Sequence, residues 1–180
     1  MSTRHVLLLR GINVGRGHRI PMAGLRAMLE DLGYGDVRTL LQSGNAAVTA
    51  SSGDQARVRR AVETAIQDTF GMQIGVVVRS RAQLEEVLAA DPLVGVADDP
   101  SRHYVGFVDP PLPDDALSAL DGPGLEPERF AVVGGHLYLW YPQGQQGSPL
   151  GDALTRLRLP GVVTMRNRRT SEKLLDLAGD

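Results

Sequence analysis

The chain contains no cysteine among its 180 residues. Disulfide bonds, thiolate catalysis and cysteine-ligated zinc or iron–sulfur centres are therefore excluded. Aromatic residues are scarce as well, at 4% of the chain, and the two strands expected at the centre of the first sheet, 5–10 and 45–50, contain none. Recognition of RNA by stacking bases on central-strand aromatics is therefore not expected. A sequence pI of about 6.1 also argues against a broad footprint on a phosphate backbone.

Long hydrophobic runs are missing from the start of the chain. Residues 1–5 lead into an apolar run of only four residues, which is too short for a signal peptide or a membrane span. Hydrophobic residues make up 42% of the chain, which suffices for a sizeable core. We expect a soluble, cytoplasmic protein with no membrane association.

The common catalytic motifs are absent too. The four histidines show no H-E-x-x-H spacing, and the glycines after the first strand match neither G-x-G-x-x-G nor the P-loop. No serine lies in a G-x-S-x-G nucleophile elbow. We therefore expect neither a cofactor nor a metal, and the sequence leaves open whether the protein is an enzyme.

The net charge of −2 is distributed unevenly. Residues 1–80 carry a net charge of +4, residues 81–155 carry −9, and residues 156–180 carry +3. Two interpretations stay open: a basic site assembled from both ends of the chain, or a drift of surface charge without functional meaning.

Hydrophobic periodicity predicts two successive units with the same order of elements. In the first unit we expect strands at 5–10, 37–42, 45–50 and 73–79 and helices at 21–32 and 54–70. A linking helix at 82–90 follows. In the second unit we expect strands at 103–108, 129–133, 136–141 and 162–165 and helices at 114–120, 150–158 and 170–178.

Both halves thus have the order β-α-β-β-α-β of the ferredoxin-like split βαβ unit. The predicted fold class is α+β, with two consecutive ferredoxin-like subdomains, a linking helix and a C-terminal helix. The predicted boundaries are 1–80 for the first subdomain, 81–101 for the linking helix and linker, and 102–180 for the second subdomain with its C-terminal helix.

A glycine-rich turn after the first strand is the strongest functional signal, because such a turn exposes backbone N–H groups and here basic residues surround it. In the split βαβ order the first two strands run parallel, so this turn and the first hairpin emerge at the same sheet edge. Alternatively, the glycines serve only the turn geometry, and Asn13 and Asn45 bond their own backbone. The predicted ligand-binding residues here are Arg10, Gly11, Asn13, Gly15, Arg16, Gln42, Ser43 and Asn45.

A second basic cluster, at residues 166–173, leads into the last helix, with Thr170 as the expected N-cap. Arg166, Asn167 and Lys173 would join the ligand site if this segment folds back. The favoured partner of the cluster is an internal one in the acidic middle segment; a ligand phosphate and a solvated face are the alternatives.

Several short motifs occur in order along the chain. They are Leu8–Gly15 (LLRGINVG), Ile20-Pro21-Met22 with Leu25, Gln42–Asn45 (QSGN), and Thr164–Asn167 with Thr170, Lys173 and Leu174. Together they resemble a widespread bacterial family known only as a domain of unknown function, number sixteen ninety-seven, over residues 5–177. The resemblance implies a two-part α+β architecture and supplies no chemistry. Arg168 stands where the family pattern has tryptophan, which argues against aromatic stacking at that position.

We therefore expect a protein that binds a small anionic, phosphate-bearing ligand at the loop after the first strand, with a nucleotide-like molecule as one candidate. The alternative is a non-enzymatic interaction or self-association module, which the lack of an acid–base or nucleophile set favours. A homodimer is left open, and nucleic acid is not expected as a partner.

Overall fold

The computed structural model describes residues 2–15, 17–122 and 124–179. The chain divides into two compact units, one formed by Met1–Glu85 with Lys173–Asp180 and the other by Glu86–Glu172. Each unit contains one four-stranded antiparallel sheet. The expected α+β class with two sheet-bearing units is confirmed.

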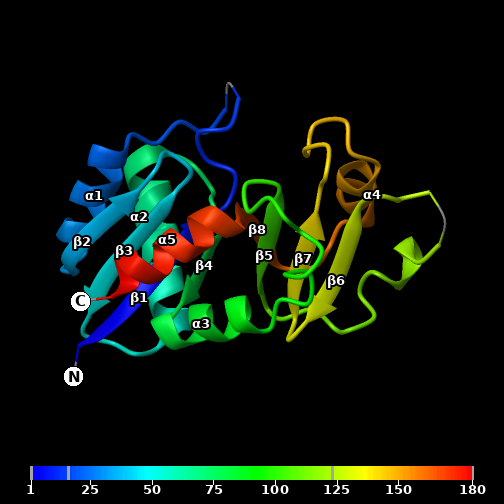
Figure 1. The fold of residues 1–180 in the computed structure, drawn as a ribbon. Coiled ribbons are helices and arrows are strands. Elements are labelled where there is room, and N and C mark those ends of the chain that lie inside the picture. Colours follow the sequence, from blue (N-terminus) through cyan, green and yellow to red (C-terminus); the bar gives the residue numbers. More distant parts are fainter. Residues whose placement is uncertain (1, 16, 123, 180) are drawn as a thin grey trace. The chain divides into compact units, whose positions relative to one another are not determined.

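The first unit places β1 at the centre of its sheet. Its elements are β1 (Thr3–Leu9), α1 (Met22–Asp31), β2 (Gly35–Leu40), β3 (Asn45–Ala50), α2 (Gln55–Phe70) and β4 (Val76–Arg79). The strand order is β2-β3-β1-β4 (Figure 1). Because β3 runs antiparallel to both β1 and β2, the latter two are parallel, and their carboxyl ends lie at the same end of the sheet.

Local signals explain where the helices of this unit begin and end. Asp54 caps α2: its side chain accepts hydrogen bonds from the amides of Ala56 and Arg57 at 2.9 and 3.1 Å. Gly71 ends α2 in the left-handed conformation. Pro21 directly precedes α1, one position earlier than the first helical position expected for it.

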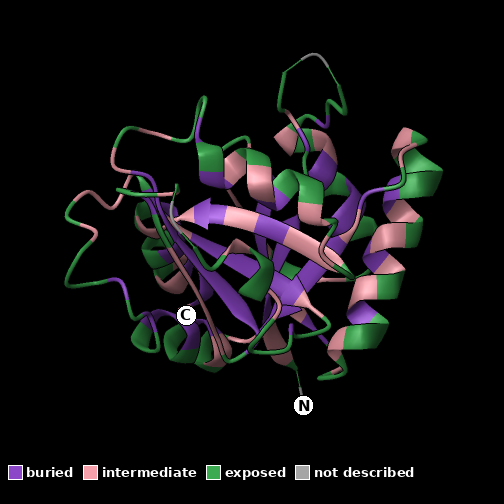
Figure 2. Cartoon of the chain, turned by 90° about the vertical axis from the view of Figure 1, so that its right-hand side faces the viewer, coloured by how far each residue is buried: buried purple, intermediate pink, exposed green. Residues whose placement is uncertain are grey.

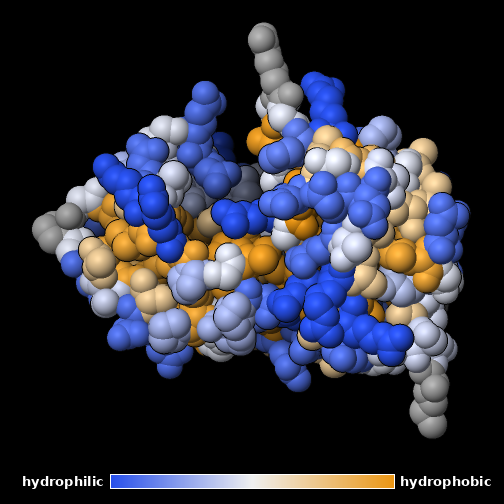
Figure 3. Space-filling view, turned by 180° about the vertical axis from the view of Figure 1, so that it is seen from behind, coloured by the Kyte–Doolittle hydropathy of each residue, from blue (hydrophilic) through white to orange (hydrophobic). Residues whose placement is uncertain are grey.

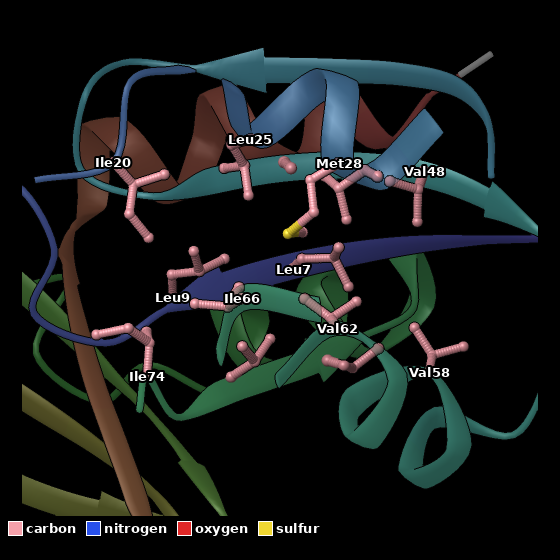
Figure 4. Packing of buried hydrophobic residues seen from close by; sticks show 14 of the residues in the cluster. Leu7, Leu9, Ile20, Leu25, Met28, Val48, Val58, Val62, Ile66 and Ile74 are labelled. Atoms are coloured by element: carbon pink, nitrogen blue, oxygen red, sulfur yellow. The ribbon is translucent and has the colours of Figure 1, made fainter. Parts of the chain in front are cut away.

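Both helices pack on one face of the first sheet. Leu7, Leu9 and Val48 project from the strands toward apolar side chains of α1 and α2, as Figure 4 shows. The buried helix residues are Leu25, Met28 and Leu29 of α1 and Val58, Val62 and Ile66 of α2. Their spacing of three and four residues forms the apolar stripe that the periodicity predicts.

The second unit repeats this strand order with fewer helical residues. Its elements are β5 (His103–Asp109), the 3-10 helix η1 (Ser118–Leu120), β6 (Arg129–Val133), β7 (His136–Trp140), α4 (Pro149–Leu157) and β8 (Val162–Asn167), in the order β6-β7-β5-β8. The two central strands β5 and β7 are mainly buried, whereas β6 and β8 consist largely of residues of intermediate burial, which Figure 2 draws in pink.

The prediction of an α-helix at 114–120 is wrong. Within this segment the amides bond to carbonyls three residues earlier, from Ser118 to Asp115 at 2.9 Å and from Leu120 to Leu117 at 2.8 Å. This bonding produces turns and one short 3-10 helix. Prolines precede this segment and a glycine-containing stretch follows it, so the segment is short. A helix of this length forms too few hydrogen bonds to offset the free-energy cost of nucleation.

Two helices carry the chain from one unit to the other, namely α3 (Arg81–Ala89) and α5 (Arg168–Ala178). The last residues of α5 belong to the first unit. There Arg4 donates to the carbonyl of Leu177 and Arg81 donates to that of Leu175, both at 3.2 Å. Cationic groups at a helix C-terminus satisfy its free carbonyls and oppose its dipole, which explains why the chain end belongs with residues 1–85.

Among the helices of the described ranges, none combines the length and the apolar character needed to cross a membrane.

Candidate functional site

The loop after β1 and the β2–β3 hairpin meet at one end of the first sheet. The amide of Leu9 donates to the carbonyl of Gly44 at 2.8 Å, and Leu8 pairs with Asn45 across the β1–β3 ladder. The Asn13 side chain donates to the carbonyl of Gln42 at 2.7 Å. The two loops are therefore neighbours, as the parallel course of β1 and β2 requires.

Asn13 holds the loop after β1 in shape. Its Oδ1 accepts from the amide of Ile20 at 3.0 Å, and its Nδ2 donates to the carbonyl of Ile20 at 2.9 Å. Its own amide donates to the carbonyl of His18 at 2.9 Å. These bonds and the one to Gln42 engage both the oxygen and the nitrogen of the side-chain amide. Asn13 therefore bonds to the backbone, as the alternative interpretation of the glycine-rich turn proposes.

The hairpin is closed in a similar way. The Asn45 side chain is fully buried and donates to the carbonyl of Leu40 and to Ser43 Oγ, each at 2.9 Å. Gly44 has a φ of +78°, and a Cβ at this position would lie 2.8 Å from Leu9 Cβ. The QSGN motif therefore builds a tight turn that is packed against the end of β1.

An open cavity lies on the other side of β1, where β4 begins. Its volume is about 250 Å³, and it is lined by Arg10, Gly11, His18, Gln73, Ile74 and Gly75. The amide of Arg10 donates to the carbonyl of Gly75 at 2.9 Å, so the end of β1 is fixed beside the start of β4. In Figure 4, Leu9, Ile20 and Ile74 lie at this end of the core. Of these three residues, Ile74 contributes an apolar side chain to the cavity lining.

The electrostatics of this cavity favour an anion. The side chains of Arg10 and His18 are exposed, and no carboxylate occurs among the described residues that line it. A Cβ added to Gly11 would meet no atom within 4 Å, so the backbone there is open to approach. Guanidinium, imidazole and amide groups are the donors that bind oxyanions.

Only some of the predicted site residues line this cavity. Arg10 and Gly11 line the cavity, whereas Gly15 and Gln42 are exposed outside it and Ser43 is partly buried in the hairpin. Arg16 lies outside the described residues. Four lining residues were not predicted, namely His18, Gln73, Ile74 and Gly75. The position of β4 beside β1 in the split βαβ order is the signal that would have found the last three.

The remaining predicted residues lie on β8 and α5. Arg166 is buried in the second unit, where it donates to Thr164 Oγ1 and to the carbonyl of Met165, both at 2.8 Å. Burial lowers the pKa of Arg166 to about 10. Asn167 Oδ1 accepts from the amide of Thr170 at 2.9 Å, so the prediction that Thr170 caps the last helix is wrong. Lys173 is exposed on α5.

One residue of the basic cluster, Arg168, forms ion pairs within the protein. Its Nη1 lies 2.6 Å from Asp91 Oδ2, and its Nε lies 3.0 Å from Glu172 Oε1. His103 Nε2 lies 3.0 Å from the same Asp91 oxygen, while Asp91 Oδ1 accepts from the amide of Leu93 at 3.0 Å. Asp91 belongs to the acidic middle segment, and its side chain is fully buried. Arg168 therefore belongs to an ion-pair network with Asp91 and Glu172.

No group of three or more histidine and acidic side chains that could hold a metal occurs in the described part of the chain.

Fold and site together define an α+β protein of two sheet-bearing units with a basic cavity at the end of β1. The family described as "Protein of unknown function (DUF1697)" matches residues 2–138, and the chain belongs to this family. A conserved bacterial protein from Streptococcus pneumoniae, SP0830, has a similar structure, with 24% identity and a TM-score of 0.79 over 99% of this chain and 100% of that one. At this identity the likeness shows the fold alone. No curated protein matches the chain.

Proposed function

We propose that the protein binds a small phosphate-bearing ligand at the cavity between the end of β1 and the start of β4. The observation that carries this proposal is a cavity lined by Arg10 and His18 without any carboxylate among its described lining residues. Its volume of about 250 Å³ lies just below the range of roughly 300–1,000 Å³ that is typical of ligand pockets. A single phosphate group with a short attached moiety suits this volume better than a polymer.

The proposal keeps Arg10 and Gly11 from the predicted site and adds His18 and Gln73. Asn13 and Asn45 act as supports, since their amides hold the loop and the hairpin. A loop fixed in this way loses little conformational entropy when a ligand binds, which raises affinity.

Titration calorimetry with inorganic phosphate tests this proposal. Arg10→Ala removes the cavity's guanidinium and should weaken binding about tenfold or more, since hydrogen bonds to charged groups contribute roughly 1.5–3 kcal/mol. Arg19→Ala is the matched control, because Arg19 is exposed in the same loop and does not line the cavity. An equal loss of phosphate affinity in both variants would mean that only the overall positive charge of the loop matters. An unchanged affinity in Arg10→Ala would refute the proposed site.

A second candidate function is self-association through the second unit. There β6 is an edge strand. Phe130 and Val132 on β6, and Val163 and Met165 on β8, pack against the core of this unit and are only partly buried. Figure 3 shows hydrophobic residues gathered over this unit, on the left of the view. An apolar edge strand can pair with a second copy of the chain.

Light scattering across the micromolar range separates the two functions. Self-association predicts a dimer that Val132→Asp disrupts and that Val94→Asp, a substitution at an exposed valine, does not. The observation of a monodisperse monomer over this concentration range would rule out strong self-association.

A further inference from the structure

A second cavity adjoins the first along the segment that leads into β4. Its volume is about 430 Å³, and it is lined by Glu63, Thr64, Gln67, Gln73, Ile74 and Gly75. The last three of these residues also line the cavity at Arg10. All lining residues belong to the first unit. The two cavities therefore share the segment 73–75 as a common wall.

Three of the residues that line the second cavity, Glu63, Thr64 and Gln67, come from α2. Glu63 and Gln67 are four residues apart, so they lie one turn above each other on the same helix face. Glu63 Oε1 accepts a hydrogen bond from the amide of Val76 at 2.9 Å. This bond fixes the carboxylate next to the start of β4.

The two ends of this combined surface carry opposite charge. Arg10 and His18 line the first cavity, and Glu63 is the one acidic residue among those described that line the second. Between them Gln73 offers a neutral amide, and Ile74, which is only 5% exposed, offers an apolar surface. A complementary ligand carries an anion at one end and a hydrogen-bond donor at the other.

We propose that the two cavities form one site for a phosphate monoester whose far end carries an amino group. This inference rests on the proposed function, because it assigns the phosphate to Arg10 and His18. The distal amino group donates to Glu63, and Gln67 accepts or donates a second hydrogen bond. A carboxylate that accepts from an amino group is a charge-assisted contact that a carbonyl or hydroxyl at the same place does not reproduce.

Two sources of this chemistry are an amino-bearing nucleotide and an amino sugar phosphate, and paired probes distinguish them. Cytidine 5′-monophosphate and uridine 5′-monophosphate differ in an amino group against a carbonyl. Glucosamine 6-phosphate and glucose 6-phosphate differ in an amino group against a hydroxyl. We expect the amino member of one pair to bind about tenfold or more tightly than its partner, and the pair that discriminates identifies the source.

Glu63→Gln should abolish this discrimination while leaving the affinity for inorganic phosphate unchanged. The substitution retains an oxygen that can accept from the amide of Val76. Glu30→Gln, at an exposed position on α1, is the matched control and should preserve the discrimination. Phosphate binding without discrimination in either pair, or discrimination that persists in Glu63→Gln, overturns the inference and leaves the proposed function standing. Failure of phosphate and of all four esters to bind overturns both.

Discussion

Asp91 offers the sharpest test of what stabilises the second unit. Its buried carboxylate accepts from Arg168 at 2.6 Å and lies 3.0 Å from His103 Nε2. Removing one partner from a buried ion pair costs about 3–5 kcal/mol, because the other charge stays in a poorly solvated place. Arg168 is 20% exposed and keeps Glu172 as a second partner. We therefore expect Asp91→Asn to cost about 3 kcal/mol, at the low end of that range.

The stability that Asp91 contributes should also depend on pH. Burial alone would raise the pKa of Asp91, but the adjacent His103 and the hydrogen bonds from the amide of Leu93 and from Arg168 outweigh this effect and hold the pKa below its ordinary value. A carboxyl group whose pKa is lower in the folded state stabilises the fold above its unfolded pKa of about 3.9, and this contribution is lost as the pH falls. The difference between the wild type and Asp91→Asn should thus be full at pH 7 and shrink below pH 4.

Urea unfolding followed by circular dichroism at pH 7 and pH 3.5 measures this difference. Asp98→Asn is the matched control, since Asp98 is exposed in the same segment, and it should change stability by less than about 0.5 kcal/mol. A loss below about 1 kcal/mol for Asp91→Asn at pH 7, or a loss that does not change with pH, would refute this account of the cluster.

Two further predictions concern single buried positions. Gly44→Ala places a Cβ 2.8 Å from Leu9 and should cost about 1–3 kcal/mol more than Gly33→Ala, where φ is also positive but the space is open; equal losses in urea unfolding would contradict the close packing. Burial raises the pKa of Tyr138 to about 12, so the unfolded chain ionises first and stability falls as the pH rises from 10 to 12. Tyr138→Phe, which loses a hydrogen bond to the carbonyl of Val87, should be less stable at pH 7 by about 1 kcal/mol and show a smaller alkaline loss; parallel pH profiles would count against this.

Much of the fold was predictable because its local signals agree with its packing. The strands at 45–50 and 129–133 have the predicted bounds, since Ser43-Gly44 and Gly134-Gly135 impose their turns through positive φ values at the glycines. Asp54 fixes the start of α2 by its own side-chain hydrogen bonds. The expected helix at 114–120 failed because short segments adopt whichever turn the surrounding packing allows.

The candidate site was harder to predict from the sequence, because asparagine donates equally well to a ligand and to the backbone. Only the observed bonds show that Asn13 and Asn45 support their own loops. Gln73 is remote from Arg10 in the sequence, and the two meet only through the pairing of β1 with β4. Likewise, the sequence left the partner of the basic cluster open, and the structure places Asp91 beside Arg168.

Backbone amide shifts in a nitrogen-15 NMR titration with inorganic phosphate test the central claim most directly. We expect the largest saturable shifts at Gly11 and Gly75, at the two sides of the cavity. These shifts should vanish in Arg10→Ala and persist in Arg19→Ala. Shifts that are largest elsewhere in the chain, or no saturable shifts at millimolar phosphate, would contradict the central claim.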